Sequence, residues 1–280
     1  MEFLGLNRIW QANNTYCYTL PNGTYQTFEK SLDLENIKTV FINIDYYSTY
    51  KEYVKQNGTK FGILDRTKFY PFAMPLNTWI FSNLKNNAKN FIPDYDDFCN
   101  FYRDNYCHYD NDKLTFNENA CLNKVEFTDI ALKVRIGYPF GSFLREFYLR
   151  HYLIWYFQKN QIPINVCYSL HDDYYNAVDI ILEKDGDFLG ICVLDASSKS
   201  KEMKDKKDNN RHKTVKNNIK VENRNGFLYD FDMIPRINFY TDVFGDDVEH
   251  LGEINVPNEK QLNVFIGEIE EFFNKKGVEK

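Results

Sequence analysis

The clearest pattern in the chain is a group of short apolar runs in its second half. Residues 162–169, 177–183 and 188–196 are rich in apolar and β-branched residues, which is typical of buried β-strands. The polar segment Lys184-Asp-Gly-Asp187 separates the last two runs. Because Asp-Gly favours tight turns between paired strands, the pattern predicts a β-hairpin there.

Helical spacing precedes and follows these strands. Residues 137–142 predict a turn, after which Ser142 caps a helix that extends to about residue 158. Residues 199–212 predict a lysine-rich helix, and residues 218–222 a fourth strand. The predicted order is therefore helix, three strands, helix, strand.

The first 130 residues predict a mixed α/β module whose role the sequence does not reveal. Residues 38–44 have the composition of a strand, whereas residues 78–89 and 95–106 have apolar positions at helical spacing. The many aromatic residues here suit a hydrophobic core or stacking on nucleobases. We expect a second domain over residues 131–280, which ends in an amphipathic helix at residues 259–275.

The net charge of −6 argues against a protein that coats nucleic acid through its overall charge. Residues 199–216 nevertheless contain eight Lys or Arg residues and three acids, a local surplus of five positive charges. This segment is either a solvated helix face or a patch that binds phosphates.

The cysteines lack the close pairing of a disulfide framework, so we expect reduced thiols and a cytoplasmic protein. Cys99, Cys107, His108 and Cys121 are close in sequence, but their spacing fits no Cys-x-x-Cys zinc pattern. No stretch approaches 18 consecutive apolar residues, so we expect neither a membrane span nor a membrane partner.

Two carboxylates fall at one end of the predicted hairpin. Asp179 stands near the start of its first strand and Asp195 near the end of its second. Antiparallel pairing brings these positions together, and a divalent metal ion fits between two such carboxylates. Charged groups that close apolar strands are costly to desolvate unless they are paired or bind something.

The element order and the two acids resemble the core of the PD-(D/E)XK nuclease superfamily, the restriction-endonuclease-like fold, over residues 135–225. The resemblance implies an αβββαβ core. It also implies that Asp179 and Asp195 hold Mg²⁺ or Mn²⁺ and that Glu146 completes the site. The superfamily has a lysine two residues after the second acid, but this chain has Ser197 there.

Lysines that follow Ser197 are candidates for the missing catalytic group. Lys199 lies two residues further on, and Lys207 belongs to the predicted lysine-rich helix. In the chemistry that the resemblance implies, such a lysine orients the attacking water and offsets negative charge. The residues expected to bind flanking phosphates are Arg145, Arg150, Lys204, Lys206 and Arg211.

Each residue also has a structural interpretation. Asp179 can pair with Arg145 or Arg150, and Asp195 can belong to a turn or cap the next helix. Glu146 is within i,i+4 reach of Arg150. We interpret His151 as a core or second-shell residue, or less readily as a phosphate contact. Asp172 and Asp173 are expected in a solvated loop, with one of them as a possible further metal ligand.

Three functions remain open at this point. The first is a metal-dependent endonuclease, acting on DNA, with a role in restriction, phage defence or mobile-element processing. A homodimer would supply the two sites that cutting both strands of a duplex needs. The second is a non-catalytic module that keeps the fold and binds nucleic acid. The third is a protein whose acidic surface binds a protein partner.

Overall fold

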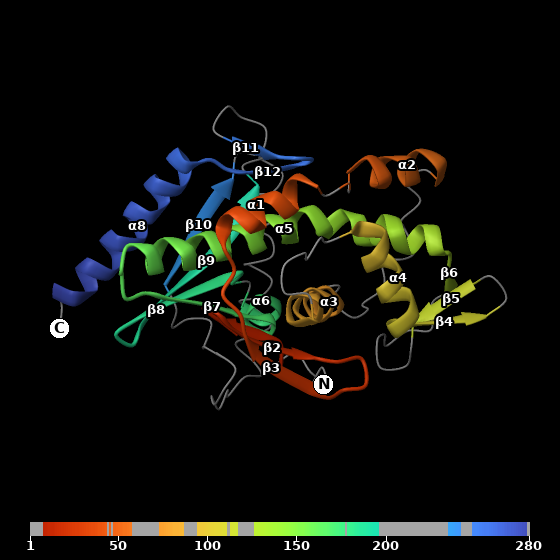
Figure 1. Ribbon diagram of the computed structural model, residues 1–280, viewed down its shortest axis with the longest axis horizontal. Coiled ribbons are helices and arrows are strands. Elements are labelled where there is room, and N and C mark those ends of the chain that lie inside the picture. Colours follow the sequence, from red (N-terminus) through yellow and green to blue (C-terminus); the bar gives the residue numbers. More distant parts are fainter. Residues whose placement is uncertain are drawn as a thin grey trace, which may run out of the picture. The chain divides into compact units, whose positions relative to one another are not determined.

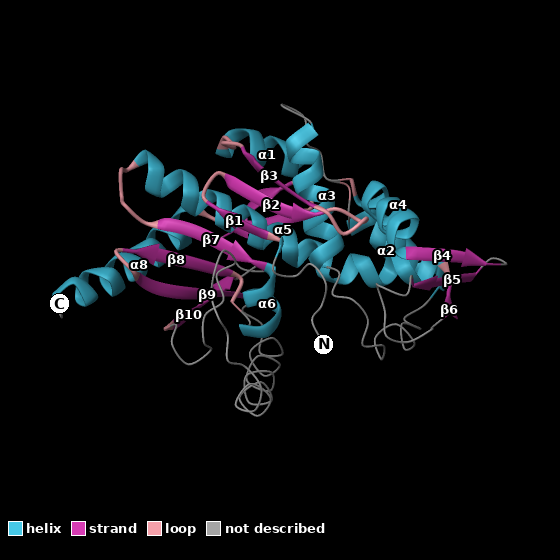
Figure 2. Ribbon diagram, turned by 90° about the horizontal axis from the view of Figure 1, so that it is seen from below, coloured by secondary structure: helices cyan, strands magenta, loops and turns pink. Residues whose placement is uncertain are grey.

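In the computed structural model, the chain forms two compact units of mixed α/β structure (Figures 1 and 2). The structure describes residues 8–43, 45, 47–57, 73–86, 94–110, 113–116, 126–176, 178–195, 235–241 and 248–278. The first unit comprises residues 1–9, 16–145 and 251–254, and the second comprises residues 10–15, 146–250 and 255–280. The chain passes between the units at several points, and one of them, at residues 145/146, lies within a helix, whereas the sequence predicted a single boundary at residues 130/131.

The first unit is mainly helical within the described residues. Its strands are β2 (Thr15–Thr19), β3 (Tyr25–Glu29), β4 (Cys107–Asp110), β5 (Lys113–Phe116) and β6 (Glu126–Phe127). Its helices are α1 (Leu34–Ile42), α2 (Tyr47–Asn57), α3 (Ala73–Asn86), α4 (Tyr95–Tyr106) and the first half of α5 (Asp129–Lys159). The predicted helices at residues 78–89 and 95–106 correspond to α3 and α4.

Aromatic side chains form much of the core of this unit. The rings of Phe98 and Phe140 stack with 6.0 Å between centroids, and the ring of Tyr95 meets Phe140 edge-on at 5.4 Å. All three residues are buried. These aromatic residues therefore pack the core, the first of the two roles that the composition suggested.

Residues 38–44 were predicted as a strand, and this prediction is wrong. Residues 34–42 form α1, whose N-cap residue Asp33 accepts a hydrogen bond from the Glu35 amide. The buried side chains of this helix are Leu34, Ile37 and Phe41, which recur at helical spacing. The Asp33 cap and this spacing outweigh the strand propensity of the β-branched residues in the segment.

The predicted turn at residues 137–142 is also wrong, because α5 continues through it and Ser142 is not its cap. A Cβ atom at Gly137 would overlap Cδ2 of Tyr50 and would lie 2.8 Å from the Tyr95 hydroxyl. Gly137 thus allows two tyrosines to pack closely against the helix, and Pro139 is accommodated in the interior of α5. Tertiary packing compensates here for two poor helix formers.

The second unit is built around one sheet. Its strands are β1 (Trp10–Ala12), β7 (Asn165–Ser169), β8 (Ile180–Lys184), β9 (Asp187–Asp195) and β10 (Arg236–Thr241). They lie in the order β10-β9-β8-β7-β1 (Figure 2). The pairs β7–β8 and β8–β9 are antiparallel, and β10 runs parallel to β9. All three strands predicted for residues 162–196 are therefore confirmed.

The predicted hairpin turn is confirmed as well. Lys184 pairs with Asp187, and Asp185 and Gly186 both have positive φ, at 55° and 84°. Two consecutive residues with positive φ are typical of the tightest hairpin turns, which explains the Asp-Gly sequence. The turn sets the register that brings Asp179 beside β9.

The remaining elements of the chain are α6 (Leu170–Asn176), β11 (Val248–Leu251), β12 (Ile254–Pro257) and α8 (Glu259–Val278). Figure 1 shows α8, the predicted final helix, beside β10, where the rings of Phe265 and Phe239 lie 4.2 Å apart. The predicted fourth strand at residues 218–222 and the lysine-rich helix lie outside the described residues. Among the described helices, none is long and apolar enough to cross a membrane.

Candidate functional site

The candidate site lies at the end of the sheet where β7 ends and β8 begins. Asp179 directly precedes β8 and is half-buried. Its Oδ2 atom accepts a hydrogen bond of 2.7 Å from the Val193 amide on β9. The Asp179 carboxylate is therefore fixed against β9 two residues before Asp195, the last residue of that strand.

A local irregularity of β8 produces this position. The ladder pairs Ile180 with Ile191, yet the Asp179 amide also donates to the Ile191 carbonyl, at 2.9 Å. Two consecutive residues opposite one partner are the signature of a β-bulge, which redirects a side chain at the end of a strand. The bulge explains why the carboxylate of Asp179 reaches forward to Val193.

The Asp195 backbone lies opposite Thr241 at the end of β10. Glu146 and Arg145 are half-buried residues of α5. Several predicted site residues, and Ser197, lie outside the described residues: Lys199, Lys204, Lys206, Lys207 and Arg211. Among the residues that the structure describes, no group of three or more His, Cys, Asp or Glu side chains is arranged to hold a metal ion. Of the residues considered for zinc, Cys121 lies outside the described residues.

Arg150 does not occupy the exposed position that binding to a flanking phosphate requires. It is 1% exposed, and its guanidinium lies 4.2 Å from the ring centroid of Tyr168 and 5.6 Å from that of Phe147. A cation that is desolvated in this way gains from the facing aromatic ring. Arg150 is therefore a buried residue that joins α5 to β7.

Asp172 and Asp173 were predicted to lie in a solvated loop, but both belong to α6. Asp172 is fully buried, and its amide donates to the Ser169 hydroxyl at 3.3 Å. The Tyr168 hydroxyl donates to Oδ2 of Asp173 at 3.3 Å. The sequence contained a signal for this helix start, because a serine followed three residues later by an acid is typical of a capping box.

One contact ties α6 to the residue before Asp179, because the Val178 amide donates to the Asp172 carbonyl at 3.5 Å. Strand β7 ends at Ser169, directly before α6, and its pairs with β8 extend to Cys167 with Ile181. Sequence reasoning missed Ser169 and Tyr168 as neighbours of the candidate site.

His151 is a buried residue of α5, in agreement with its interpretation as a core residue. Its Nδ1 lies 2.7 Å from the Phe147 carbonyl oxygen, which can only accept a hydrogen bond, so Nδ1 carries the proton. Its Nε2 lies 3.4 Å from the amide nitrogen of Gln11. Burial, reinforced by the charge of Arg150, lowers the pKa of His151 to about 3.

This pKa predicts that the protein loses stability in mild acid. Below pH 6.5 the histidine takes up a proton in the unfolded chain but stays neutral in the folded one, so unfolding is favoured as the pH falls towards about 3. At pH 5 we expect a contribution of about 2 kcal/mol to the loss of unfolding free energy. Urea unfolding at pH 7 and pH 5 should show a smaller difference for His151→Gln than for wild type; an equal difference would contradict the prediction.

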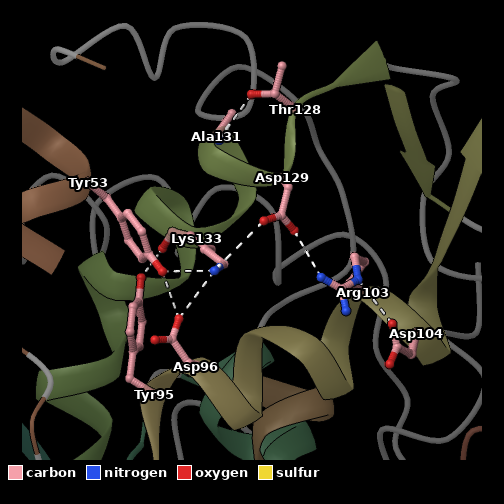
Figure 3. A network of polar contacts seen from close by, with 9 residues as sticks. All are labelled: Tyr53, Tyr95, Asp96, Arg103, Asp104, Thr128, Asp129, Ala131 and Lys133. Atoms are coloured by element: carbon pink, nitrogen blue, oxygen red, sulfur yellow. Dashed lines mark hydrogen bonds and ion pairs between the residues drawn. The ribbon is translucent and has the colours of Figure 1, made fainter. Parts of the chain in front are cut away.

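A second group of charged side chains, in the first unit, links α2, α4 and α5 (Figure 3). The ammonium of Lys133 lies 2.8 Å from the Tyr53 hydroxyl, 3.3 Å from Oδ1 of Asp96 and 3.8 Å from Oδ2 of Asp129. Arg103 also contacts Asp129, at 3.5 Å. Burial lowers the pKa of Lys133, but the contacts with Tyr53 and Asp96 outweigh it and raise this pKa to about 12.

The described partners of Lys133 all belong to this group of charged side chains. We therefore interpret the group as a structural network. Lys133 is only 17% exposed, so we expect Lys133→Met to lower the unfolding free energy by about 1–2 kcal/mol. Chemical denaturation measures this loss, with Lys260, an exposed residue of α8, replaced by Met as the matched control. Equal stability of the two variants would show that the network contributes nothing.

The chain was compared with known proteins. No protein-family model matches it, and neither a curated protein nor a solved structure shows significant similarity to it. The function is therefore inferred from the site.

Proposed function

We propose that the protein is a metal-dependent endonuclease that hydrolyses phosphodiester bonds, with DNA as the first substrate to test. The observation that carries this proposal is the Asp179 carboxylate, held against the Val193 amide two residues before Asp195. A half-buried carboxylate beside a second acid at a strand end suits a site for a divalent cation. Restriction, phage defence and mobile-element processing are roles that fit this activity.

The arrangement of the second unit supports a restriction-endonuclease-like core. Helix α5 is followed by the antiparallel strands β7, β8 and β9, with the short helix α6 between β7 and β8, and β10 then joins the sheet beside β9. Apart from α6, this order is compatible with the αβββαβ order of the PD-(D/E)XK superfamily for the elements within the described residues. The first unit would then contribute recognition or regulation.

Asp179 and Asp195 are the residues that would hold Mg²⁺ or Mn²⁺, since carboxylate oxygens are the ligands that these ions prefer. The ion, when bound, polarises the phosphate and lowers the pKa of a bound water. The Val193 amide donates a hydrogen bond to one oxygen of Asp179, and this bond fixes the orientation of the carboxylate. Orientation of ligands by such bonds is common around metal sites.

The protein's own groups would orient the water and offset the developing charges. A water oxygen forms the new bond to phosphorus and gives up a proton to bulk water, while the bond to the leaving oxygen breaks and that oxygen takes up a proton from bulk water. Lys199 or Lys207 would orient the water and offset charge on the non-bridging oxygens. Glu146 would accept a hydrogen bond from the water and hold it in line.

The test is cleavage of labelled DNA and RNA, single- and double-stranded, by purified protein with Mg²⁺ or Mn²⁺. We expect cutting that EDTA abolishes and that is lost in both Asp179→Ala and Asp195→Ala. The controls are the same substitutions at Asp185 and Asp187 of the hairpin turn, which should cut normally. Cutting that persists without either carboxylate would refute the proposal.

One observation favours a second candidate function. Ser197 occupies the position of the superfamily lysine, and a site that has lost this lysine can retain binding without catalysis. A non-catalytic module of this kind would bind nucleic acid in a salt-sensitive manner but cut none of the substrates. Binding without cleavage in the same panel would decide for it.

A further inference from the structure

Strand β10 presents a row of polar and aromatic side chains on one face. Successive side chains of a strand point to opposite faces of the sheet. Phe239 packs on Phe265 of α8, so Arg236, Asn238 and Tyr240 belong to the opposite face. Asn238 is exposed, Tyr240 is 38% exposed and Arg236 is half-buried. Among the described strands, β10 is the last at its side of the sheet, so this row lies along the edge of the described sheet.

Contacts with neighbouring residues hold the row in place. Arg236 is paired with Gly190 of β9, and a Cβ atom at Gly190 would lie 3.0 Å from Cγ of Arg236. The absence of a side chain at Gly190 therefore lets the stem of Arg236 lie across β9. The Asn238 amide donates to the Tyr240 hydroxyl at 3.3 Å, which ties these two side chains together.

The row leads towards the candidate catalytic residues. Because β9 and β10 are parallel, Tyr240 is paired with Leu194, and the next pair is Thr241 with Asp195. Successive members of the row are about 6.6 Å apart along the strand. Thr241 and its partner Asp195 belong to the face of Phe239, so a chain bound along the row would reach the end of β9 from the opposite face of the sheet and would pass over the strand end to approach Asp195.

We propose that Arg236, Asn238 and Tyr240 bind an unpaired segment of a nucleic-acid strand beside the cleavage site. The Arg236 guanidinium contacts a phosphate, a base stacks on the Tyr240 ring, and Asn238 orients that ring. A base can stack on a tyrosine of a sheet only when it is outside a duplex, so the substrate is single-stranded at this point. This inference rests on the proposed function, since it specifies the substrate of that site.

Binding of fluorescent oligodeoxythymidine, measured by anisotropy in EDTA, tests the row without any cleavage. We expect Tyr240→Ala to weaken binding roughly 5- to 100-fold, since stacking on one aromatic side chain contributes that much. Tyr240→Phe keeps the ring and should bind within about twofold of wild type. Arg236→Met keeps the stem over Gly190 and should reduce the salt slope by about 0.7, the loss of one phosphate contact.

The matched control is Tyr25→Ala. Tyr25 on β3 is 56% exposed and lies under the guanidinium of Arg8, at 4.9 Å from the ring centroid. It is thus another exposed tyrosine with an arginine nearby, on a different strand. Its replacement should leave binding unchanged.

Unchanged binding by Tyr240→Ala overturns the inference, as does wild-type protein that binds only duplex or no nucleic acid. If wild type cuts while the Tyr240 variants bind and cut normally, the row is wrong and the nuclease proposal stands. If wild type never cuts but loses binding when Tyr240 is replaced, the row stands and the catalytic proposal is wrong. The two failures are therefore distinguishable.

Discussion

Asp179→Asn is expected to reduce metal-dependent cleavage by about 10³-fold while leaving the fold intact. Asparagine retains an oxygen that can accept the hydrogen bond from the Val193 amide, so the contact between the start of β8 and the end of β9 survives. The amide has no negative charge to bind a divalent cation. A metal ion contributes several kcal/mol of transition-state stabilisation, which corresponds to about three orders of magnitude in rate.

Asp179→Ala separates the chemical role of this residue from its structural one. It should cut as poorly as Asp179→Asn but should also lose about 1 kcal/mol of stability, because the Val193 amide no longer has its acceptor. Initial cleavage rates and urea unfolding of both variants provide the comparison. If Asp179→Asn cuts at the wild-type rate and only Asp179→Ala is impaired, Asp179 acts as a strand cap and not as a metal ligand.

Arg150→Ala is expected to lower the free energy of unfolding by about 3–5 kcal/mol. The side chain is fully buried, and its removal leaves a cavity between α5 and the ring of Tyr168 while the charge–ring contact is lost. Arg150→Met fills most of the volume without the charge and should lose less. Thermal and urea unfolding of both variants would measure the difference.

The control for Arg150 is Arg145→Ala on the same helix, where the half-buried side chain should contribute less than about 1 kcal/mol. The phosphate-binding role first considered for Arg150 makes the opposite prediction. In that case Arg150→Ala would unfold like wild type, and the salt dependence of nucleic-acid binding would become shallower. A stable Arg150→Ala protein with such a shallower slope would restore that role.

Local patterns were enough to predict the strands β7, β8 and β9 and the hairpin between β8 and β9. The apolar runs were continuous, and the Asp-Gly turn requires positive φ at two consecutive residues, so both signals lie within a few residues of the chain. The positions of Asp179 and Asp195 at strand ends followed from these elements. The start of α6 was also readable, since Ser169 and Asp172 have capping-box spacing.

Other features depended on residues far apart in the sequence. Gly137 looked like part of a turn, but it lies in α5 because the rings of Tyr50 and Tyr95 need its open space. From the sequence, Arg150 looked like a surface cation. Its burial depends on the aromatic rings that cover the charge, and the local sequence does not reveal these rings. The row on β10 was hidden as well, since exposure and pairing with Gly190 are properties of the assembled sheet.

The sequence by itself determined that β7, β8 and β9 are strands, where the turn between β8 and β9 lies and which acids close these two strands, because hydrophobic period and turn chemistry act over short range. The tertiary structure decided that Asp179 bulges towards Val193 and that Arg150 is buried. It also decided that Arg236 and Tyr240 share one face beside the end of β9. These outcomes follow from strand register and side-chain packing, which form only when distant segments meet.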